Sequence, residues 1–532
     1  LGRHVDDHLR CGIKSAIERG IIQDITLHEM VRRILRMGRD VGFLDGAWVE
    51  RVEVVQHVHL PASLGQQAVH QVTADEPGPP GDQNPANMGH AGRECIPRPR
   101  SGYFRPPMIP GEPILIISHT FPPYKGIGGR RWAKFAKELA RRGHPVHVVH
   151  SAGSEDLMGS LWTDDADRPG ITAHPLPQRY PTVLFKRPLT TIGAKVMYRV
   201  WSRLLPLITR GNWLDKSVLW RKQLVDTCTA LIRGHNIHHV VVTGAPFGLM
   251  AHTCALRGVF PDLKLVADFR DPWTWGHYYG QGVLSPRRKA EEQRREAEVA
   301  RVFNKLISPA PDIVEHLRHT YGGDPARYIL LPHAIDPEEM GTGPIARNDN
   351  EYRMIYAGSL YGAEEAEAYF EEVLRAFERL RDKDPERSAR TFFDLYITGH
   401  GTEAYRAKAE ARGLGAHIRF HAPLPPKAIF PLIAAADLVV IFIPRPNKDF
   451  LGTKFNEIFY LRKPVLHVGA EGRVGRTITE RGLGASIRVD EVAYELPRII
   501  RGERTIAIDP DADLSGHLLS HITDRLVREV LA

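Results

Sequence analysis

The stretch from Pro113 to Val149 constrains the fold of this chain more than any other. It opens with the short apolar run Ile114–Ile117, which is typical of a strand buried on both faces. A loop with two prolines and three glycines follows over residues 119–129, and residues 131–140 then place apolar side chains at helical spacing. A second apolar run begins at Val146. The order strand, loop, helix, strand predicts an α/β unit.

The glycine-rich loop of this unit precedes a helix N-terminus. Free amides and the helix dipole favour an anion there, and glycine lets the backbone approach a ligand closely. The loop has neither a GxGxxG spacing nor a Walker lysine. From the residues alone, a phosphate site and a tight connection that binds nothing both remain open.

Composition narrows the class of protein. A chain of 532 residues with 42% hydrophobic content can bury two or three cores. Its net charge of +8 is mild for this length, so it favours anionic ligands or membrane surfaces without requiring nucleic acid. The four cysteines form no CxxC, and we find neither a bilayer-spanning apolar run nor a signal-peptide pattern. A cytoplasmic, reduced location is expected.

The first 107 residues do not share the α/β pattern. Residues 75–110 are crowded with proline and glycine, a composition that rarely packs a core. The chain begins with a leucine, and Met108 stands just before the first convincing strand. We expect residues 1–107 to be a dispensable extension or a stretch that precedes the true start, with a small regulatory domain as the alternative.

Two series of alternating strands and helices follow the extension. The first covers residues 108–336 and the second residues 351–505, with a polar linker at 337–350 and a helical segment at 506–532. Serial doubly wound halves bind ligands at the carboxyl ends of their strands and enclose a cleft. The predicted fold class is therefore α/β with two such halves.

Residues 186–222 are rich in cations and tryptophans. They carry nine Lys or Arg residues against the single acid Asp215, with Trp201, Trp213 and Trp220 among them. Basic and aromatic side chains on an amphipathic stretch suit contact with an anionic membrane. A solvated helix with ordinary core tryptophans is the alternative. Nucleic-acid binding is a third possibility, but no recognisable nucleic-acid-binding motif supports it.

Two clusters are candidates for the site. Residues 268–273, Asp-Phe-Arg-Asp-Pro-Trp, follow a predicted strand at the sheet edge where ligands bind, although an Asp–Arg pair that stitches a loop would look similar. In the second half, Thr453 is a good N-cap, so Lys454 and Glu457 share one face of a first helical turn. The carboxylate there suits ribose hydroxyls, and the lysine with the free amides suits a diphosphate. An ordinary i, i+3 salt bridge is the alternative.

Residues 111 to about 501 resemble the GT-B glycosyltransferases of the family-4 type, which transfer sugars from nucleotide donors with retention of anomeric configuration. The resemblance rests on the order and spacing of several short motifs. In chain order these are ISHTFPPYKGIGGRR, VADFRDPW, ILLPHAID, MIYAGSL, LYITGHG, IRFHAPLP, AADLVVIFI and GTKFNEIFYLRKPVL. It implies the GT-B fold, with two Rossmann-like domains that face a central cleft.

The resemblance also implies roles for individual residues. Gly128 and Gly129 would face the donor diphosphate, while Lys454 and Glu457 would bind phosphate and ribose. We expect further donor contacts from Gly358, Ser359 and Gly399. On the acceptor side we expect Tyr124, Lys125, Asp268 and Trp273.

The chain departs from the family pattern in three places. Arg270 stands where many members have a catalytic histidine, Ser359-Leu360-Tyr361 where many have an arginine and a lysine, and His333-Ala334 where Asn-Gly is usual. The departing nucleotide diphosphate gains charge in the transition state, so a cation is needed, and Arg270, Lys454 and Lys448 are candidates. The expected catalytic residues are Arg270, Asp271 and Lys454.

The resemblance thus implies a retaining hexosyltransferase. It would move a hexose from a UDP- or GDP-sugar to a lipid-linked or saccharide acceptor in surface polysaccharide or glycolipid synthesis, at the inner face of the plasma membrane. We expect no metal, no other cofactor and no nucleic-acid partner, and no DxD motif stands at a loop tip. The alternatives are a nucleotide-sugar epimerase of the same fold and a catalytically inactive nucleotide-sugar-binding protein.

Overall fold

The computed structural model describes most of the chain after residue 110, and all described residues belong to one unit, Ser101–Ala532. The expected N-terminal extension lies outside them. The described ranges are residues 111–124, 127–153, 158–185, 189–276, 279–341, 348–360, 363–398, 402–449, 453–509 and 511–531.

The first half is built on a seven-stranded parallel sheet in the order β3-β2-β1-β4-β5-β6-β7. The strand order reverses between β1 and β4, as in a doubly wound sheet. The strands are β1 (Ile114–Ile117), β2 (Val146–Ser151), β3 (Ile171–Leu176), β4 (His239–Gly244), β5 (Lys264–Phe269), β6 (Lys305–Ser308) and β7 (Tyr328–Leu330).

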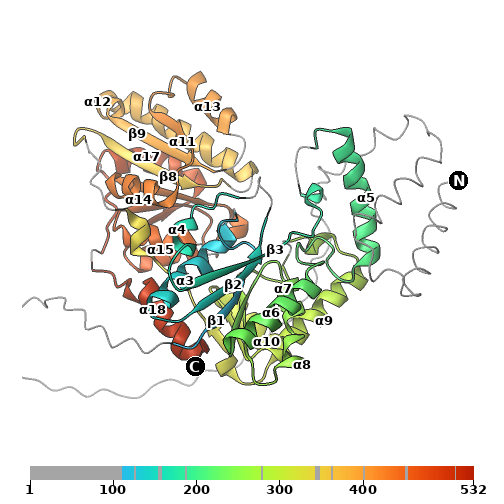
Figure 1. Cartoon of the computed structure of the whole chain (residues 1–532). Coiled ribbons are helices and arrows are strands. Elements are labelled where there is room, and N and C mark those ends of the chain that lie inside the picture. Colours follow the sequence, from blue (N-terminus) through green and yellow to red (C-terminus); the bar gives the residue numbers. More distant parts are fainter. Residues whose placement is uncertain are drawn as a thin grey trace, which may run out of the picture. The chain divides into compact units, whose positions relative to one another are not determined.

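Helices cover both faces of this sheet, so its central strands need apolar residues on both sides. The helices are α3 (Arg130–Arg141), α4 (Thr163–Ala166), α5 (Ile192–Ile208), α6 (Arg221–His235), α7 (Gly248–Thr253), α8 (Leu256–Val259), α9 (Pro286–Val302) and α10 (Pro311–Tyr321). In β1, Leu115 and Ile117 pack with α6, α7, α9 and α10, whereas Ile114 and Ile116 pack with α3 and a C-terminal helix (Figure 1).

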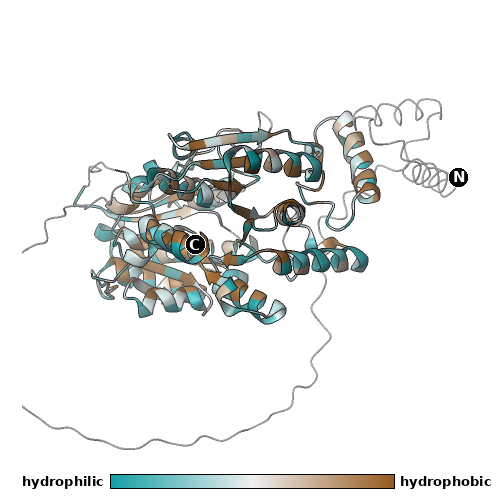
Figure 2. Ribbon diagram, turned by 60° about the horizontal axis from the view of Figure 1, so that its bottom comes forward, coloured by the Kyte–Doolittle hydropathy of each residue, from teal (hydrophilic) through white to brown (hydrophobic). Residues whose placement is uncertain are grey.

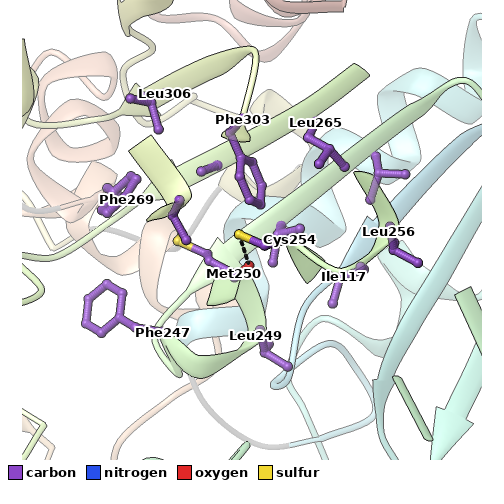
Figure 3. Close-up of a cluster of buried hydrophobic side chains, with 14 of the residues drawn as sticks. Ile117, Phe247, Leu249, Met250, Cys254, Leu256, Leu265, Phe269, Phe303 and Leu306 are labelled. Carbon is purple, nitrogen blue, oxygen red and sulfur yellow. Dashed lines mark hydrogen bonds between the residues drawn. The ribbon is translucent and has the colours of Figure 1, made fainter. Parts of the chain in front are cut away.

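Figure 3 shows part of the core on the α7 side, where Ile117, Phe247, Met250 and Phe303 converge. The thiol of Cys254 donates to the Met250 carbonyl oxygen at 3.6 Å. Burial raises the pKa of this thiol to about 12, so Cys254 is a neutral core residue. Cys254 is a free cysteine, as expected from a sequence without a CxxC motif.

The second half repeats the plan with six parallel strands in the order β10-β9-β8-β11-β12-β13. The strands are β8 (Tyr352–Gly358), β9 (Thr391–Ile397), β10 (Ile418–His421), β11 (Leu438–Ile443), β12 (Val465–Gly469) and β13 (Gly484–Ile487). The helices are α11 (Ala363–Lys383), α12 (Pro385–Ala389), α13 (Thr402–Ala411), α14 (Pro426–Ala435), α15 (Thr453–Tyr460), α16 (Arg473–Glu480) and α17 (Val492–Ile500). In Figure 2 the helices carry both teal and brown along their length, as expected of helices with one polar and one apolar face.

The chain passes between the halves twice, at two segments that pair with each other. Ile335 donates its backbone N–H to the His517 carbonyl and accepts from the Leu519 N–H, each at 2.7 Å. Ile335 and Met340 pack in the core of the second half. After the second passage, α18 (Leu519–Arg525) and the π-helix Leu526–Leu531 pack beside α3 on the first half. The helical end of the chain therefore belongs to the first core.

The start of the expected linker is structured. Pro337–Met340 form a 3₁₀ turn in which Glu339 and Met340 are buried. Residues 342–347 lie outside the described residues. The polar composition of residues 337–350 suggested a simple spacer. Glu339 within it is nevertheless buried, because it pairs with buried cations, as described below.

The basic stretch at 186–222 is divided between two helices. α5 contains its middle, and α6 begins at Arg221. Trp201 and Trp220 are buried, so for these two residues the core interpretation is the right one. The described part of the chain contains no helix long and apolar enough to cross a membrane.

Candidate functional site

A cavity of about 1480 Å³ is lined by residues of both halves. It lies at the carboxyl ends of strands, where β1 and β5 of the first sheet and β8 of the second end in loops. Its lining includes His119, Thr120, Tyr124, Gly128, Arg130, Arg131, Lys134, Arg270, Asp271, His333, Gly358, Ser359 and Glu457.

The glycine loop after β1 is tightly folded against its own start. A Cβ on Gly129 would lie 1.8 Å from the Thr120 carbonyl oxygen, so no larger residue fits without a shift. A Cβ on Gly128 would lie 2.8 Å from the Thr120 hydroxyl and 2.9 Å from Arg270 Nη1. Gly128 lines the cavity, while Gly129 is buried. The glycines thus permit close packing at the start of α3, the helix end at which an anion would be favoured.

Arg270 ties three loops together at the edge of the cavity. Its Nε donates to the Gly244 carbonyl at 2.8 Å, Nη2 donates to the Ala245 carbonyl at 3.1 Å, and Nη1 donates to the Gly128 carbonyl. Neighbouring Asp271 accepts a hydrogen bond from the Tyr279 hydroxyl at 2.8 Å. Two of the three expected catalytic residues, Arg270 and Asp271, therefore line the cavity, and Arg270 is held in place by its carbonyl partners.

Two expected acceptor-side residues, Asp268 and Trp273, are not among the residues that line the cavity. Asp268 is fully buried and accepts from Trp132 Nε1 at 2.7 Å and from the Thr243 hydroxyl at 3.1 Å. Trp273 is also fully buried, and its Nε1 donates to Glu292 Oε2 at 2.8 Å. Asp268 lies in β5 and Trp273 in the loop after it, and both side chains are held in the interior of the first half by these hydrogen bonds. Their contact with the acceptor stays a prediction.

The remaining expected residues divide into described and undescribed groups. Tyr124 lines the cavity, with its ring edge-on to His119 at 5.5 Å between centroids. Gly358 and Ser359 also line the cavity, and the Ser359 and Thr398 hydroxyls hydrogen bond at 2.6 Å. Lys125, Gly399 and the side chain of Lys454 lie outside the described residues, although the α15 backbone is described from Thr453.

Glu457 is buried and pairs with cations of the first half. Its Oε1 lies 2.6 Å from Arg130 Nη2 and 3.1 Å from Lys134 Nζ, and its Oε2 accepts from Arg130 Nη1 at 3.2 Å. Arg130 therefore binds the carboxylate in a bidentate way, the geometry in which an arginine–carboxylate interaction is strongest. The carboxylate expected to bind ribose already has partners in this structure.

Glu339 is a second carboxylate shared by the same cations. Arg130 Nε donates to its Oε1 at 3.2 Å, and Lys134 Nζ lies 2.8 Å from its Oε2. Trp162 Nε1 donates to Oε1 at 2.9 Å. Burial alone would raise the pKa of Glu339, but Arg130 and Lys134 outweigh it and lower this pKa to about 2. Glu339 is therefore a buried anion at neutral pH.

The cations form one face of α3. Arg130, Lys134 and Lys137 are spaced i, i+4, i+7, and Lys137 Nζ bonds Asp336 and lies 3.0 Å from Asp165. The helix was predicted from its apolar stripe alone, and these cations were not among the expected site residues. The basic spacing was a visible signal, but their acidic partners are far away in the chain and could not be identified.

Oxygens of Asp165, Asp336 and Glu339 lie within 4.8 Å of one another, a grouping that can hold a metal ion. Here Lys137 bridges the two aspartates, and Glu339 is neutralised by Arg130 and Lys134. These three carboxylates are thus matched to ammonium and guanidinium groups.

Two neutral histidines complete the lining. Burial, with Lys216 and His150 nearby, lowers the pKa of His119 to about 3. Burial among the cations of α3 and Arg270 lowers the pKa of His333 well below its ordinary value. The positive charge of the lining in the first half therefore comes from arginine and lysine, and it exceeds the negative charge of Asp215, Asp271 and Asp312. An excess of positive charge suits an anionic ligand.

Comparisons with known proteins give a family match for part of the chain. Residues 128–339 match the model of Glycosyltransferase Family 4. No curated protein matches the sequence.

Similar solved structures come from several bacteria. A glycosyltransferase from Rickettsia africae ESF-5 has 11% identity and a TM-score of 0.47, over 79% of this chain and 94% of that chain. Sucrose-phosphate synthase from Thermosynechococcus elongatus has 15% identity and a TM-score of 0.47, over 79% and 95%. UDP-GlcNAc 2-epimerase from Neisseria meningitidis, solved with UDP-GlcNAc, has 11% identity and a TM-score of 0.45, over 79% and 99%. Because these scores are below 0.5, the fold assignment rests on the two sheets themselves.

The family match begins at the glycine loop, includes the cationic face of α3 and ends at Glu339. The two doubly wound sheets around one cavity are the GT-B architecture of two Rossmann-like domains. The resemblance of this chain to the GT-B glycosyltransferases of the family-4 type is thus confirmed.

Proposed function

We propose that this protein is a retaining hexosyltransferase that uses a UDP- or GDP-sugar. The observation that carries the proposal is the cavity at the carboxyl ends of both sheets, where Glu457 of the second half meets a cationic lining from the first. A nucleotide sugar needs both features, because it joins hydroxyl-rich ribose to an anionic diphosphate.

The donor nucleotide is assigned to the second half. The first turn of α15 offers free amides at Thr453 and Lys454, with Glu457 one turn along for the ribose hydroxyls. Gly358 lies at the end of β8 and Ser359 directly after it, and both also line the cavity. The diphosphate would then face the cations of the first half.

Stabilisation of the leaving group is assigned to fixed positive charge. Charge on the diphosphate grows as the glycosidic bond breaks, and preorganised cations favour that change. Arg270 is held by three backbone carbonyls, so it presents its charge without having to reorganise. Lys454 is proposed as the second cation, and no metal ion is required by this arrangement.

The acceptor is proposed to be lipid-linked or a saccharide, reached at the inner face of the plasma membrane during surface polysaccharide or glycolipid synthesis. The exposed side of α5 supports the membrane part. Ile192, Val196 and Leu207 are 82%, 42% and 52% exposed, and Arg199 and Arg203 fall between them at helical spacing. Apolar and basic side chains on one exposed face suit an anionic lipid surface.

A binding screen followed by turnover tests the proposal. UDP, GDP, ADP and their sugars are added to the protein in a thermal-shift assay, since a ligand at 100 times its Kd adds about 2.7 kcal/mol of stability. The nucleotide that binds is then supplied as a radiolabelled sugar with extracted lipid acceptors. We expect label to move to an acceptor. Conversion without any acceptor would indicate an epimerase, and binding without turnover an inactive nucleotide-sugar-binding protein.

A further inference from the structure

The oxygens of Glu457 are engaged by the first half. Arg130 contacts both oxygens, at 2.6 and 3.2 Å, and Lys134 adds a third contact at 3.1 Å. A carboxylate has about four acceptor positions, and two ribose hydroxyls need two of them. The full set of contacts therefore cannot persist while Glu457 binds both hydroxyls in good geometry.

The two cations have an alternative partner. Both also contact Glu339, which lies in the turn after the first passage between the halves. Removing the partner of a buried charge is costly when nothing replaces it. Here Arg130 and Lys134 remain paired with Glu339 when Glu457 moves away. Their contacts with Glu457 can therefore be replaced by those of a ligand without leaving a buried charge unpaired.

We propose that Arg130 and Lys134 act as a latch that competes with the donor ribose for Glu457. This inference rests on the proposed function, because it takes Glu457 as the ribose ligand. While the latch is closed, these contacts hold α3 and α15 together and the carboxylate is unavailable. Nucleotide binding withdraws Glu457 from Arg130, and the cations remain on Glu339. The affinity for nucleotide is then reduced by the fraction of molecules in which the latch is closed.

The sign of one mutational effect distinguishes the latch from a purely positioning role. Arg130→Gln opens the latch, so a competing Arg130 predicts tighter binding of the nucleotide, by roughly 3- to 10-fold in Kd. If Arg130 only orients Glu457, the same variant binds more weakly. Glu339→Gln has the opposite prediction, since the cations lose their alternative anion and hold Glu457 more firmly. Its Kd should rise by a similar factor.

The measurement is isothermal titration calorimetry of the full chain with UDP, GDP and ADP. The matching nucleoside is titrated as well. It has no phosphate, so its Kd reports only the contact between ribose and Glu457 and is unaffected by the loss of attraction between Arg130 and the diphosphate. In a Glu457→Gln background the effect of Arg130→Gln should disappear, which a double-mutant cycle measures directly. Arg141→Gln is the matched control, since this arginine of α3 pairs with Glu138 and Glu338 away from the cavity and should leave Kd unchanged.

Each outcome decides something different. If the wild-type protein binds none of the three nucleotides, the proposed function fails and takes the latch with it. If it binds one, and Arg130→Gln weakens or does not change nucleoside binding, the latch alone is overturned. If Arg130→Gln does not fold, Glu339→Gln decides by itself, because a Kd that is unchanged or lower contradicts the latch.

Discussion

Two helices of the first half, α3 and α5, carry cations for different purposes. On α3, Arg130, Lys134 and Lys137 are buried, and each contacts at least two carboxylates. On α5, Arg199 and Arg203 are exposed, and no carboxylate of the described residues lies within ion-pair distance of either. The same residue type thus binds the two halves together on one helix and faces solvent on the other. Whether a cation of these helices forms buried ion pairs or faces solvent therefore depends on what packs against the helix, more than on the sequence of the helix itself.

The largest expected difference between the two helices is in stability. Lys137→Ala leaves Asp165 and Asp336 buried without their shared cation, which costs about 3–5 kcal/mol. Arg203→Ala on the exposed face should change stability by less than about 0.5 kcal/mol. Urea unfolding followed by circular dichroism measures both. Equal midpoints for the two variants would show that the buried contacts of α3 are not what stabilises this region.

A second prediction concerns the cation proposed at the start of α15. Lys454→Ala removes charge beside a diphosphate that becomes more negative during reaction, so kcat should fall by roughly 10²–10³. Melting temperature should stay close to that of the wild type, because the lysine is not expected to fill a core. Lys408→Ala, in a partly buried ion pair with Glu371, is the control. A full kcat in the Lys454 variant would remove this lysine from the mechanism.

A third test is the dependence of the free energy of unfolding on pH in the acidic range, which reports on the ion pairs of Arg130 and Lys134 with Glu339. The pKa of Glu339 is about 2 in the folded protein, below its ordinary value of 4.5. Its contribution is therefore fully present above about pH 4.5 and is lost as the pH falls from there toward 2. Glu339→Gln should be less stable at neutral pH and should lose less stability than the wild type over this window. Parallel curves for the two proteins between pH 5 and 3 would contradict the assignment.

The smallest effect is expected on α5. Reversing Arg199 and Arg203 to Glu should weaken sedimentation with anionic vesicles, by about 1 kcal/mol for each cation near the surface. Salt should release the wild-type protein in the same way. Changing Ile192 to Ser tests the apolar part separately. Equal binding to neutral vesicles, or no effect of the charge reversal, would remove the membrane from the proposal.

Much of the fold was predictable from the sequence, because strand and helix periodicities were clear. Ile114–Ile117, the glycine loop and α3 lie where the pattern placed them, and the two doubly wound sheets are confirmed. The return of α18 to the first core was not predictable, since short amphipathic segments do not reveal which half they pack against.

The site was predicted less completely than the fold. Residues near strand ends were identified, but the sequence could not show which of them are buried: Asp268 and Trp273 are fully buried, whereas Arg270 and Asp271 line the cavity. Conversely, the partners of Glu457 are more than 300 residues away from it in the chain. Only the three-dimensional structure brings them together, so the sequence could name the carboxylate and not its counter-ions.

The central claim is that Glu457 belongs to a nucleotide-sugar site at this cavity. The most direct test is calorimetric titration of Glu457→Gln with the nucleotide that the wild-type protein binds, beside Glu338→Gln, whose carboxylate is half exposed and pairs with Lys137 and Arg141. Glu457→Gln keeps the size of the side chain but loses the charge that strengthens hydrogen bonds to ribose. We predict roughly tenfold weaker binding for Glu457→Gln and unchanged binding for Glu338→Gln. Wild-type affinity in both variants, with both proteins folded, would contradict the account.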